Sequence, residues 1–211
     1  MIKCVLTDIN GDIKAEFGGE KVDSVYGGEY RQGDTFRVTS DSEFIEVSFD
    51  ESQAASTVYV PDREFKYSVP YGVMLDAYDA ESWEKSGHRI TVREVCGDDV
   101  CAKRNIAMNS IDTEGASGVF PHAEANFVTR GEEVFKPRNA IDGNCENRGH
   151  GRYPYNSWAG GAREDLVYTL DFGREVEVEE LGFYLRADFP HDTYWKSIDV
   201  EFSDGSVEQA S

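Results

Sequence analysis

The sequence lacks the patterns that mark membrane proteins and secreted proteins. No apolar run approaches the roughly 18 residues of a membrane-spanning helix, so we expect no membrane insertion. The N-terminus also lacks the basic segment and apolar run of a signal peptide. This predicts a soluble, cytoplasmic protein with reduced thiols, or an extracellular one if a leader has been removed.

Cysteine is scarce as well. Only four are present, and Cys96 and Cys101 are the pair that lies close together in the sequence. A zinc site needs a second such pair or histidines at matching spacing, and the sequence has neither. Phosphate-binding loops, nucleophile elbows and HExxH motifs are missing too, so no common motif points to catalytic residues.

Positive charge is the third deficiency. The chain has 21 Lys and Arg against 41 Asp and Glu, a formal net charge of −20. Such a field repels nucleic acid phosphates and anionic membrane surfaces, so we expect no nucleic acid partner. It disfavours an acidic polysaccharide for the same reason. Whether some carboxylates bind a cation or only favour solubility stays open.

What the sequence does have is strand-like alternation. The chain of 211 residues has 39% hydrophobic residues and 20 glycines, enough for one large or two small domains. Short apolar–polar alternations are bounded by turn residues such as Asn10-Gly11-Asp12. The expected strands lie at residues 2–6, 35–38, 44–49, 57–60, 65–69, 90–92, 123–128, 166–172, 176–185 and 198–202. This spacing predicts an all-β protein with two β-sandwich domains.

The two predicted domains meet at residues 96–104, which read CGDDVCAKR and have no periodic pattern. Residues 1–95 then form an N-terminal β-sandwich of unassigned role, 96–104 a linker, and 105–211 the second sandwich. Trp83, in an expected loop at 82–87, is predicted to be a core or rim residue.

Two long loops interrupt the second domain. Residues 137–158 read PRNAIDGNCENRGHGRYPYNSW, with little periodicity and many glycines, amides and aromatics. Residues 186–195 read RADFPHDTYW and lie between two expected strands. Long structured loops are usually functional. We expect the two loops to lie near one another.

Several short motifs come in an order that suggests a family. They are AEAN at 123–126, NAIDGN at 139–144, SW at 157–158, YTLDFG at 168–173 and IDVEFSDGS at 198–206. Together they resemble the discoidin, or coagulation factor five/eight C-type, domain over residues 104–211. The resemblance implies a galactose-binding-like jelly roll, shared with the family thirty-two carbohydrate-binding modules. Members continue for a strand or two past the SDG turn, which implies a longer natural chain or a sandwich completed otherwise.

The resemblance also implies a structural calcium ion at the Ala-Ile-Asp-Gly turn, with Asp142 and Asn144 as metal ligands. Ca²⁺ binds several hard oxygens, and a glycine-containing turn lets carbonyl groups point toward an ion. The alternative is that Asp142 only caps its own turn. In the family pattern Trp158 belongs to the core.

Sugar recognition needs an aromatic ring for the C–H face of the sugar and polar groups for its hydroxyls. The two loops carry this mixture. The predicted ligand-binding residues are His150, Arg152, Tyr153, Tyr155, Arg186, Asp188, His191 and Trp195. Other interpretations stay open. Arg186 and Asp188 could form a structural ion pair, and His191 could cap the turn.

We therefore expect a non-catalytic, lectin-like carbohydrate-binding protein whose partner is a glycan or glycoconjugate. One alternative is a protein-interaction or assembly module, with a homo-oligomer as one of its forms. A polysaccharide lyase or a glycosidase is the other, and no motif singles out catalytic residues for either.

Overall fold

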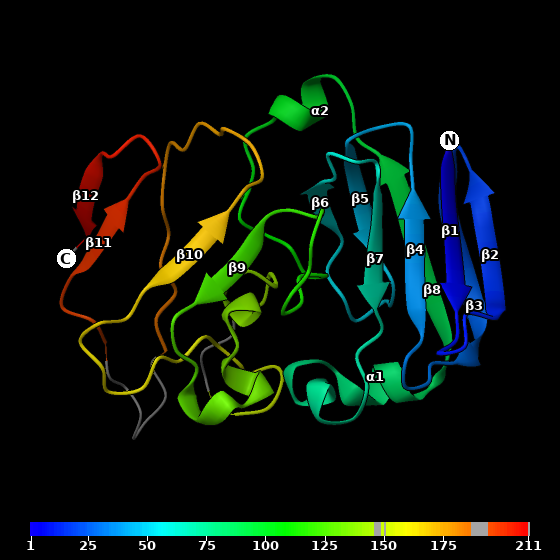
Figure 1. The fold of residues 1–211 in the computed structure, drawn as a ribbon, viewed down its shortest axis with the longest axis horizontal. Helices are drawn as coiled ribbons and strands as arrows, with labels where there is room; N and C mark the ends of the chain where they lie inside the picture. Colours follow the sequence, from blue (N-terminus) through cyan, green and yellow to red (C-terminus); the bar gives the residue numbers. More distant parts are fainter. Residues whose placement is uncertain (146–148, 150, 187–193, 211) are drawn as a thin grey trace.

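The computed structural model describes residues 1–145, 149, 151–186 and 194–210, and these form antiparallel sheets with few helices (Figure 1). The all-β class is thereby confirmed. One four-stranded sheet has the order β2-β1-β4-β7, built from β1 (Ile2–Thr7), β2 (Ile13–Gly19), β4 (Thr35–Thr39) and β7 (Glu64–Ser68). The other has the order β3-β8-β5-β6, built from β3 (Lys21–Glu29), β5 (Phe44–Ser48), β6 (Ser56–Tyr59) and β8 (Ser86–Glu94).

The first two strands form a hairpin because of the turn between them. Gly11 has a φ of 86°, which a side chain rarely tolerates. The Asp8 carboxylate accepts hydrogen bonds from the main-chain N–H groups of Asn10 (2.8 Å) and Asp12 (2.9 Å). The predicted turn is confirmed, and β1 and β2 pair antiparallel from it.

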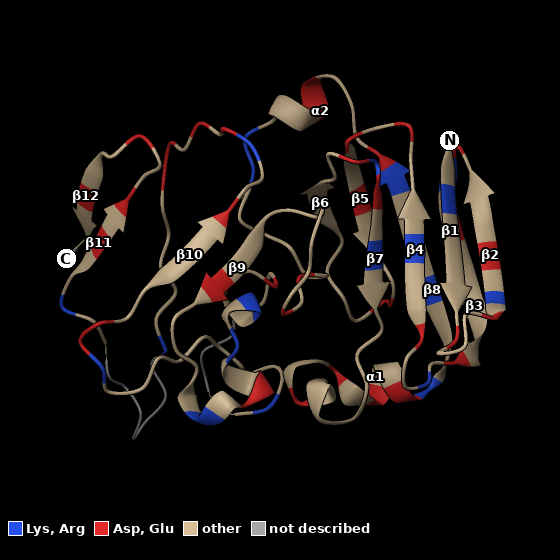
Figure 2. Ribbon diagram, in the orientation of Figure 1, with Lys and Arg blue, Asp and Glu red and all other residues tan. Residues whose placement is uncertain are grey.

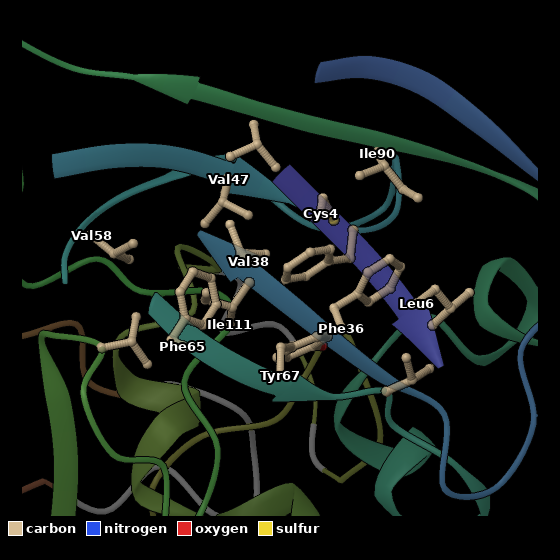
Figure 3. Packing of buried hydrophobic residues seen from close by; sticks show 14 of the residues in the cluster. Cys4, Leu6, Phe36, Val38, Val47, Val58, Phe65, Tyr67, Ile90 and Ile111 are labelled. Carbon is tan, nitrogen blue, oxygen red and sulfur yellow. The ribbon is translucent and has the colours of Figure 1, made fainter. Parts of the chain in front are cut away.

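The core lies between the two sheets. In β5 the side chains of Ile45 and Val47 are buried, as alternation predicts for the inner face of a strand. Phe36 of β4 and Phe49 stack with ring centroids 4.4 Å apart, and Phe49 in turn stacks on Tyr67 of β7. Figure 3 shows this cluster, to which strands of both sheets contribute.

Charged residues of both signs occur along the strands of both sheets (Figure 2). Cross-strand ion pairs join neighbouring strands: Arg37–Glu64 at 2.8 Å, Arg89–Asp23 at 2.8 Å and Arg93–Glu46 at 2.7 Å. These pairs are exposed, so they add little to the stability of the fold and mainly favour the correct strand register.

The rest of the chain has shorter elements. They are η1 (Gly72–Ala77), α1 (Ala80–Glu84), α2 (Asp98–Cys101), β9 (His122–Ala125), η2 (Thr129–Gly131), η3 (Glu133–Phe135), η4 (Pro137–Ala140), β10 (Tyr168–Asp171), β11 (Ile198–Glu201) and β12 (Val207–Ala210). β9 pairs with β10, and β11 pairs with β12, both antiparallel. The two chain ends lie at opposite ends of the long axis (Figure 1). Among the helices of the described residues, none is long and apolar enough to cross a membrane.

The chain after residue 104 packs directly on the first two sheets. Ile111 and Val119 are buried and belong to the same core cluster as the strands of both sheets (Figure 3 shows Ile111). Tyr59, at the end of β6, exchanges main-chain hydrogen bonds with Phe120. The two parts of the chain therefore share one core at this junction.

Some regions differ from the expected elements. Residues 176–185, all described, take part in none of the paired strands, although Val176 and Val178 are half-buried. Trp83 lies in α1 instead of a loop, and it is 2% exposed. Asp79 caps this helix by accepting the main-chain N–H of Ser82, which explains why a short helix begins there. The four cysteines are free, with Cys4 buried and the others exposed.

Candidate functional site

The turn after η4 is organised by Asp142. Its carboxylate accepts a hydrogen bond from the main-chain N–H of Asn144 (2.8 Å) and one from the side-chain amide of Asn156 (3.1 Å). Asn144 in turn donates its side-chain N–H to the carbonyl of Pro154 (2.6 Å). Asp142 therefore caps its own turn, as the alternative interpretation held, and the amides of Asn144 and Asn156 connect that turn to residues 154–156.

Arg138 lies beneath this turn and is only 6% exposed. Its guanidinium donates to the carbonyls of Asp112 (2.8 Å) and Ser110 (3.0 Å) and to the side chain of Asn139 (2.9 Å). The ring of Tyr78 covers the guanidinium at 4.4 Å. A buried charge needs such partners, because desolvating an unpaired one costs several kcal/mol.

The positive charge of Arg138 stabilises the ionised form of the Asp142 carboxyl group. Burial raises the pKa of Asp142 above its ordinary value, while the Arg138 guanidinium and the two amide donors favour the ionised form. The carboxylate thus lies in a buried environment that a nearby cation partly compensates.

The described residues provide little for a calcium ion at this turn. They contain no group of three or more His, Cys, Asp or Glu side chains that could hold a metal. Asp142 is already bonded by two N–H groups and has a guanidinium nearby. Since Ca²⁺ binds six to eight oxygens, these residues do not make up its site by themselves, and calcium at Asp142 and Asn144 stays a prediction.

Asp76, at the end of η1, holds the part of the long loop that follows. Its main-chain carbonyl accepts the N–H of Tyr153 (2.8 Å), and its carboxylate pairs with Arg152 at 2.9 Å. The Arg152 side chain is nevertheless 80% exposed, and Tyr153 is half-buried. Burial raises the pKa of Tyr153.

The two predicted loops do meet in the structure. The rings of Trp158 and Trp195 lie 5.5 Å apart, and Arg186 donates to the carbonyl of Gly149 at 3.5 Å. Trp158 is half-buried, packs against the Tyr168 ring at 5.1 Å with the two planes tilted by 50°, and donates its indole N–H to the Phe127 carbonyl. It therefore packs between the loops, and it is half-buried where the family pattern predicted a core position.

Two aromatic side chains are exposed beside this contact, Tyr155 at 37% and Trp195 at 43%. His150, Asp188 and His191, which complete the predicted ligand set, lie outside the described residues. The described part of the predicted site is thus Arg152, Tyr153, Tyr155, Arg186 and Trp195. Of these, Tyr153 also faces a cavity.

A cavity of about 210 Å³ lies between the first part of the chain and the Asp142 turn. It is lined by Ser52, Gln53, Ala54, Ala77, Tyr78, Asp79, Trp83, Ser110, Arg138, Asp142, Gly143, Asn144 and Tyr153. We call it the junction cavity. Asp142, Asn144 and Tyr153 were singled out from the sequence, whereas Arg138, Tyr78 and Trp83 were not assigned to a site.

A larger concavity of about 440 Å³ lies on the first part of the chain. Tyr71, which is 47% exposed, lines it together with Pro70 and Trp83. None of the residues predicted to bind ligand contributes to it. We therefore regard the junction cavity and the Tyr155–Trp195 surface as the candidate site.

No protein-family model, curated protein or solved structure matches this chain.

Proposed function

We propose that this protein binds a glycan without catalysing its cleavage, through a surface formed by Arg152, Tyr155, Arg186 and Trp195, which we call the loop surface. The observation that carries the proposal is the contact between the two loops at Trp158 and Trp195. This contact brings segments far apart in the sequence together, which supports a shared surface of aromatic rings and guanidinium groups.

The chemistry of the loop surface suits sugars. An exposed ring such as that of Trp195 covers the apolar C–H face of a pyranose, and guanidinium N–H groups bond its hydroxyls. The Trp195 ring packs against Trp158, so less conformational entropy of the Trp195 side chain is lost when a ligand binds. The net charge of −20 favours a neutral glycan over an acidic one.

Our proposal also covers the arrangement of the sheets and the family to which the second part of the chain is related. We infer that the two four-stranded sheets form one β-sandwich and that residues 105–211 form a discoidin-like unit. The resemblance in the NAIDGN and YTLDFG motifs supports this, as does the pairing of β9 with β10. A calcium ion at Asp142 is tested by titration: at 100 times its dissociation constant it would stabilise the fold by about 2.7 kcal/mol, and Asp142→Asn would remove that effect.

A glycan array followed by calorimetric titration of the best ligand tests the function. Trp195→Ala and Tyr155→Ala should each weaken binding by about tenfold or more, since an aromatic contact in a sugar site contributes about 1.4 kcal/mol or more. Tyr71→Ala, which removes an exposed ring from the larger concavity, is the matched control. Unchanged affinity in both loop variants, or the absence of any bound glycan, would contradict the proposal.

A protein-interaction role is the second candidate, and one observation favours it. Leu181, Phe183 and Tyr184 are 47%, 46% and 76% exposed on one extended segment. Exposed large apolar side chains close together in the chain are candidates for an interface. Sedimentation of the wild-type protein and of Phe183→Asp would show whether this segment mediates self-association.

A further inference from the structure

We infer that the junction cavity binds a single neutral sugar ring, so that the protein recognises the terminal residue of a glycan and not the middle of a chain. This inference rests on the proposed function and names its substrate class. It concerns residues that the sequence motifs did not assign to ligand binding, in particular Arg138, Tyr78 and Ala54.

The size of the cavity sets the first constraint. The cavity has a volume of about 210 Å³, which is small for a ligand site. Pockets for drug-sized ligands begin at about 300 Å³, so a disaccharide would extend beyond the cavity. One ring inside and the rest of the glycan outside is the arrangement that this volume allows.

Charge sets the second constraint. Arg138 contributes a buried positive charge to the lining, and Asp142 and Asp79 contribute carboxylates. An anionic ligand would meet these two carboxylates, and a cationic ligand would meet the guanidinium. A neutral ligand avoids both repulsions, which agrees with the negative charge of the whole chain.

Hydrogen-bonding capacity sets the third constraint. Three of the five N–H groups of a guanidinium are used by Arg138 within the described residues, which leaves two as donors. Each carboxylate oxygen of Asp142 accepts one hydrogen bond and has capacity for another. A sugar hydroxyl both donates and accepts, so a polyhydroxylated ring matches this mixture, with Tyr78 and Tyr153 supplying apolar surface.

The test fills the cavity without touching its charged groups. Ala54 is exposed, lines the cavity and lies beside the Asp142 turn, while Ala55 is exposed and does not line it. Ala54→Trp should lower the affinity for the best ligand by about 100-fold, since the ring loses its site, and Ala55→Trp should leave it unchanged. If thermal melting shows that Ala54→Trp impairs folding, the smaller Ala54→Leu substitution replaces it in the test.

The outcomes separate this inference from the proposal on which it rests. Loss of binding in the Ala54 variants, with the wild-type protein binding the free monosaccharide measurably and Ala54→Trp not binding it, supports terminal recognition. Wild-type affinity in Ala54→Trp together with loss in Trp195→Ala would overturn the inference and leave glycan binding intact. Absence of glycan binding by the wild-type protein would overturn both.

Discussion

At the residue scale, burial of charge is concentrated in a few well-partnered groups. Asp50 and His88 are both fully buried, with Oδ2 and Nδ1 2.7 Å apart. Ser52 donates to the same Asp50 carboxylate from its main chain and its hydroxyl. Burial acts to raise the pKa of Asp50, but these hydrogen bonds outweigh it, so the pKa lies below the ordinary value.

This arrangement predicts how Asp50→Asn changes stability. A carboxyl group whose pKa falls on folding stabilises the fold above its unfolded pKa of about 4 and loses that effect as pH falls through the folded value. At pH 7 we expect the Asp50→Asn substitution to cost about 1.5–3 kcal/mol, the range for a hydrogen bond to a charged group. Urea unfolding at several pH values should show the difference from wild type shrinking below pH of about 4.

Asp98→Asn removes one exposed carboxylate and is the charge-matched control for that series. If Asp50→Asn differed from wild type by a constant amount across the acidic range, the ionised state of Asp50 would not be what stabilises the fold.

Arg138 gives a second prediction at this scale. Lysine keeps the charge but cannot donate to three acceptors from one plane. Arg138→Lys should therefore destabilise the protein by about 2–4 kcal/mol, toward the range for breaking a buried charged pair. Arg37→Lys, at an exposed pair, should change the midpoint of urea unfolding little. Equal effects of the two substitutions would contradict the structural role given to Arg138.

Only part of the candidate site follows from residue patterns. Asp142, Asn144 and Tyr153 lie in a loop whose composition stands out, and the motif order identified the turn. Arg138 and Tyr78 have no comparable signal, because a single arginine or tyrosine in a loop is ordinary. Their importance comes from packing between segments about 60 residues apart in the chain, and local sequence does not encode that.

At the element scale, the strands buried on one face were the ones predicted. β5 and β7 alternate, and their inward-facing apolar residues Ile45, Val47, Phe65 and Tyr67 are buried. β2 and β3 were not predicted, and each lies at the edge of its sheet with mostly half-exposed or exposed residues. β6 and β7 are edge strands as well and were predicted, so composition makes the difference: β2 and β3 contain two glycines each and few buried apolar residues, which weakens their alternation.

The junction between the two parts of the chain is the element-scale feature with a direct consequence. Ile111 is 1% exposed and lies in the core of the first two sheets, although it follows the expected linker (Figure 3). Ile111→Ala should cost about 2–5 kcal/mol, as for other buried large-to-alanine changes. This substitution should lower the midpoint of a single cooperative urea transition of the whole chain, and no separate minor transition should appear.

Hydrogen exchange tests, amide by amide, whether the two parts of the chain unfold together. Amides of Asn109–Ile111 should gain exchange in step with those of β4 and β5 in the Ile111→Ala protein. Ile106→Ala, at a half-buried position just before, is the control. Exchange confined to residues 105–145, with the strands unchanged, would show that the two parts unfold separately.

At the scale of the whole molecule, charge of one sign dominates. Acidic residues occur over both parts of the chain, whereas several basic residues sit in the cross-strand pairs (Figure 2). Two electrostatic effects therefore oppose each other. Salt weakens the exposed pairs, whose contribution is small, and it also screens the mutual repulsion of 20 net negative charges.

The repulsion should win, because it acts over the whole surface while the pairs are few and exposed. We expect the Tm to rise by a few degrees between about 0.02 and 0.2 M NaCl, where the Debye length falls from above 20 Å to below 10 Å. For a chain of this size about 2–4 °C corresponds to about 1 kcal/mol. Replacing Asp98, Asp99 and Glu208, three exposed acidic residues, with Asn or Gln should raise the Tm at low salt and reduce its salt dependence. A Tm that falls as salt is added would mean that the ion pairs between strands outweigh the net charge.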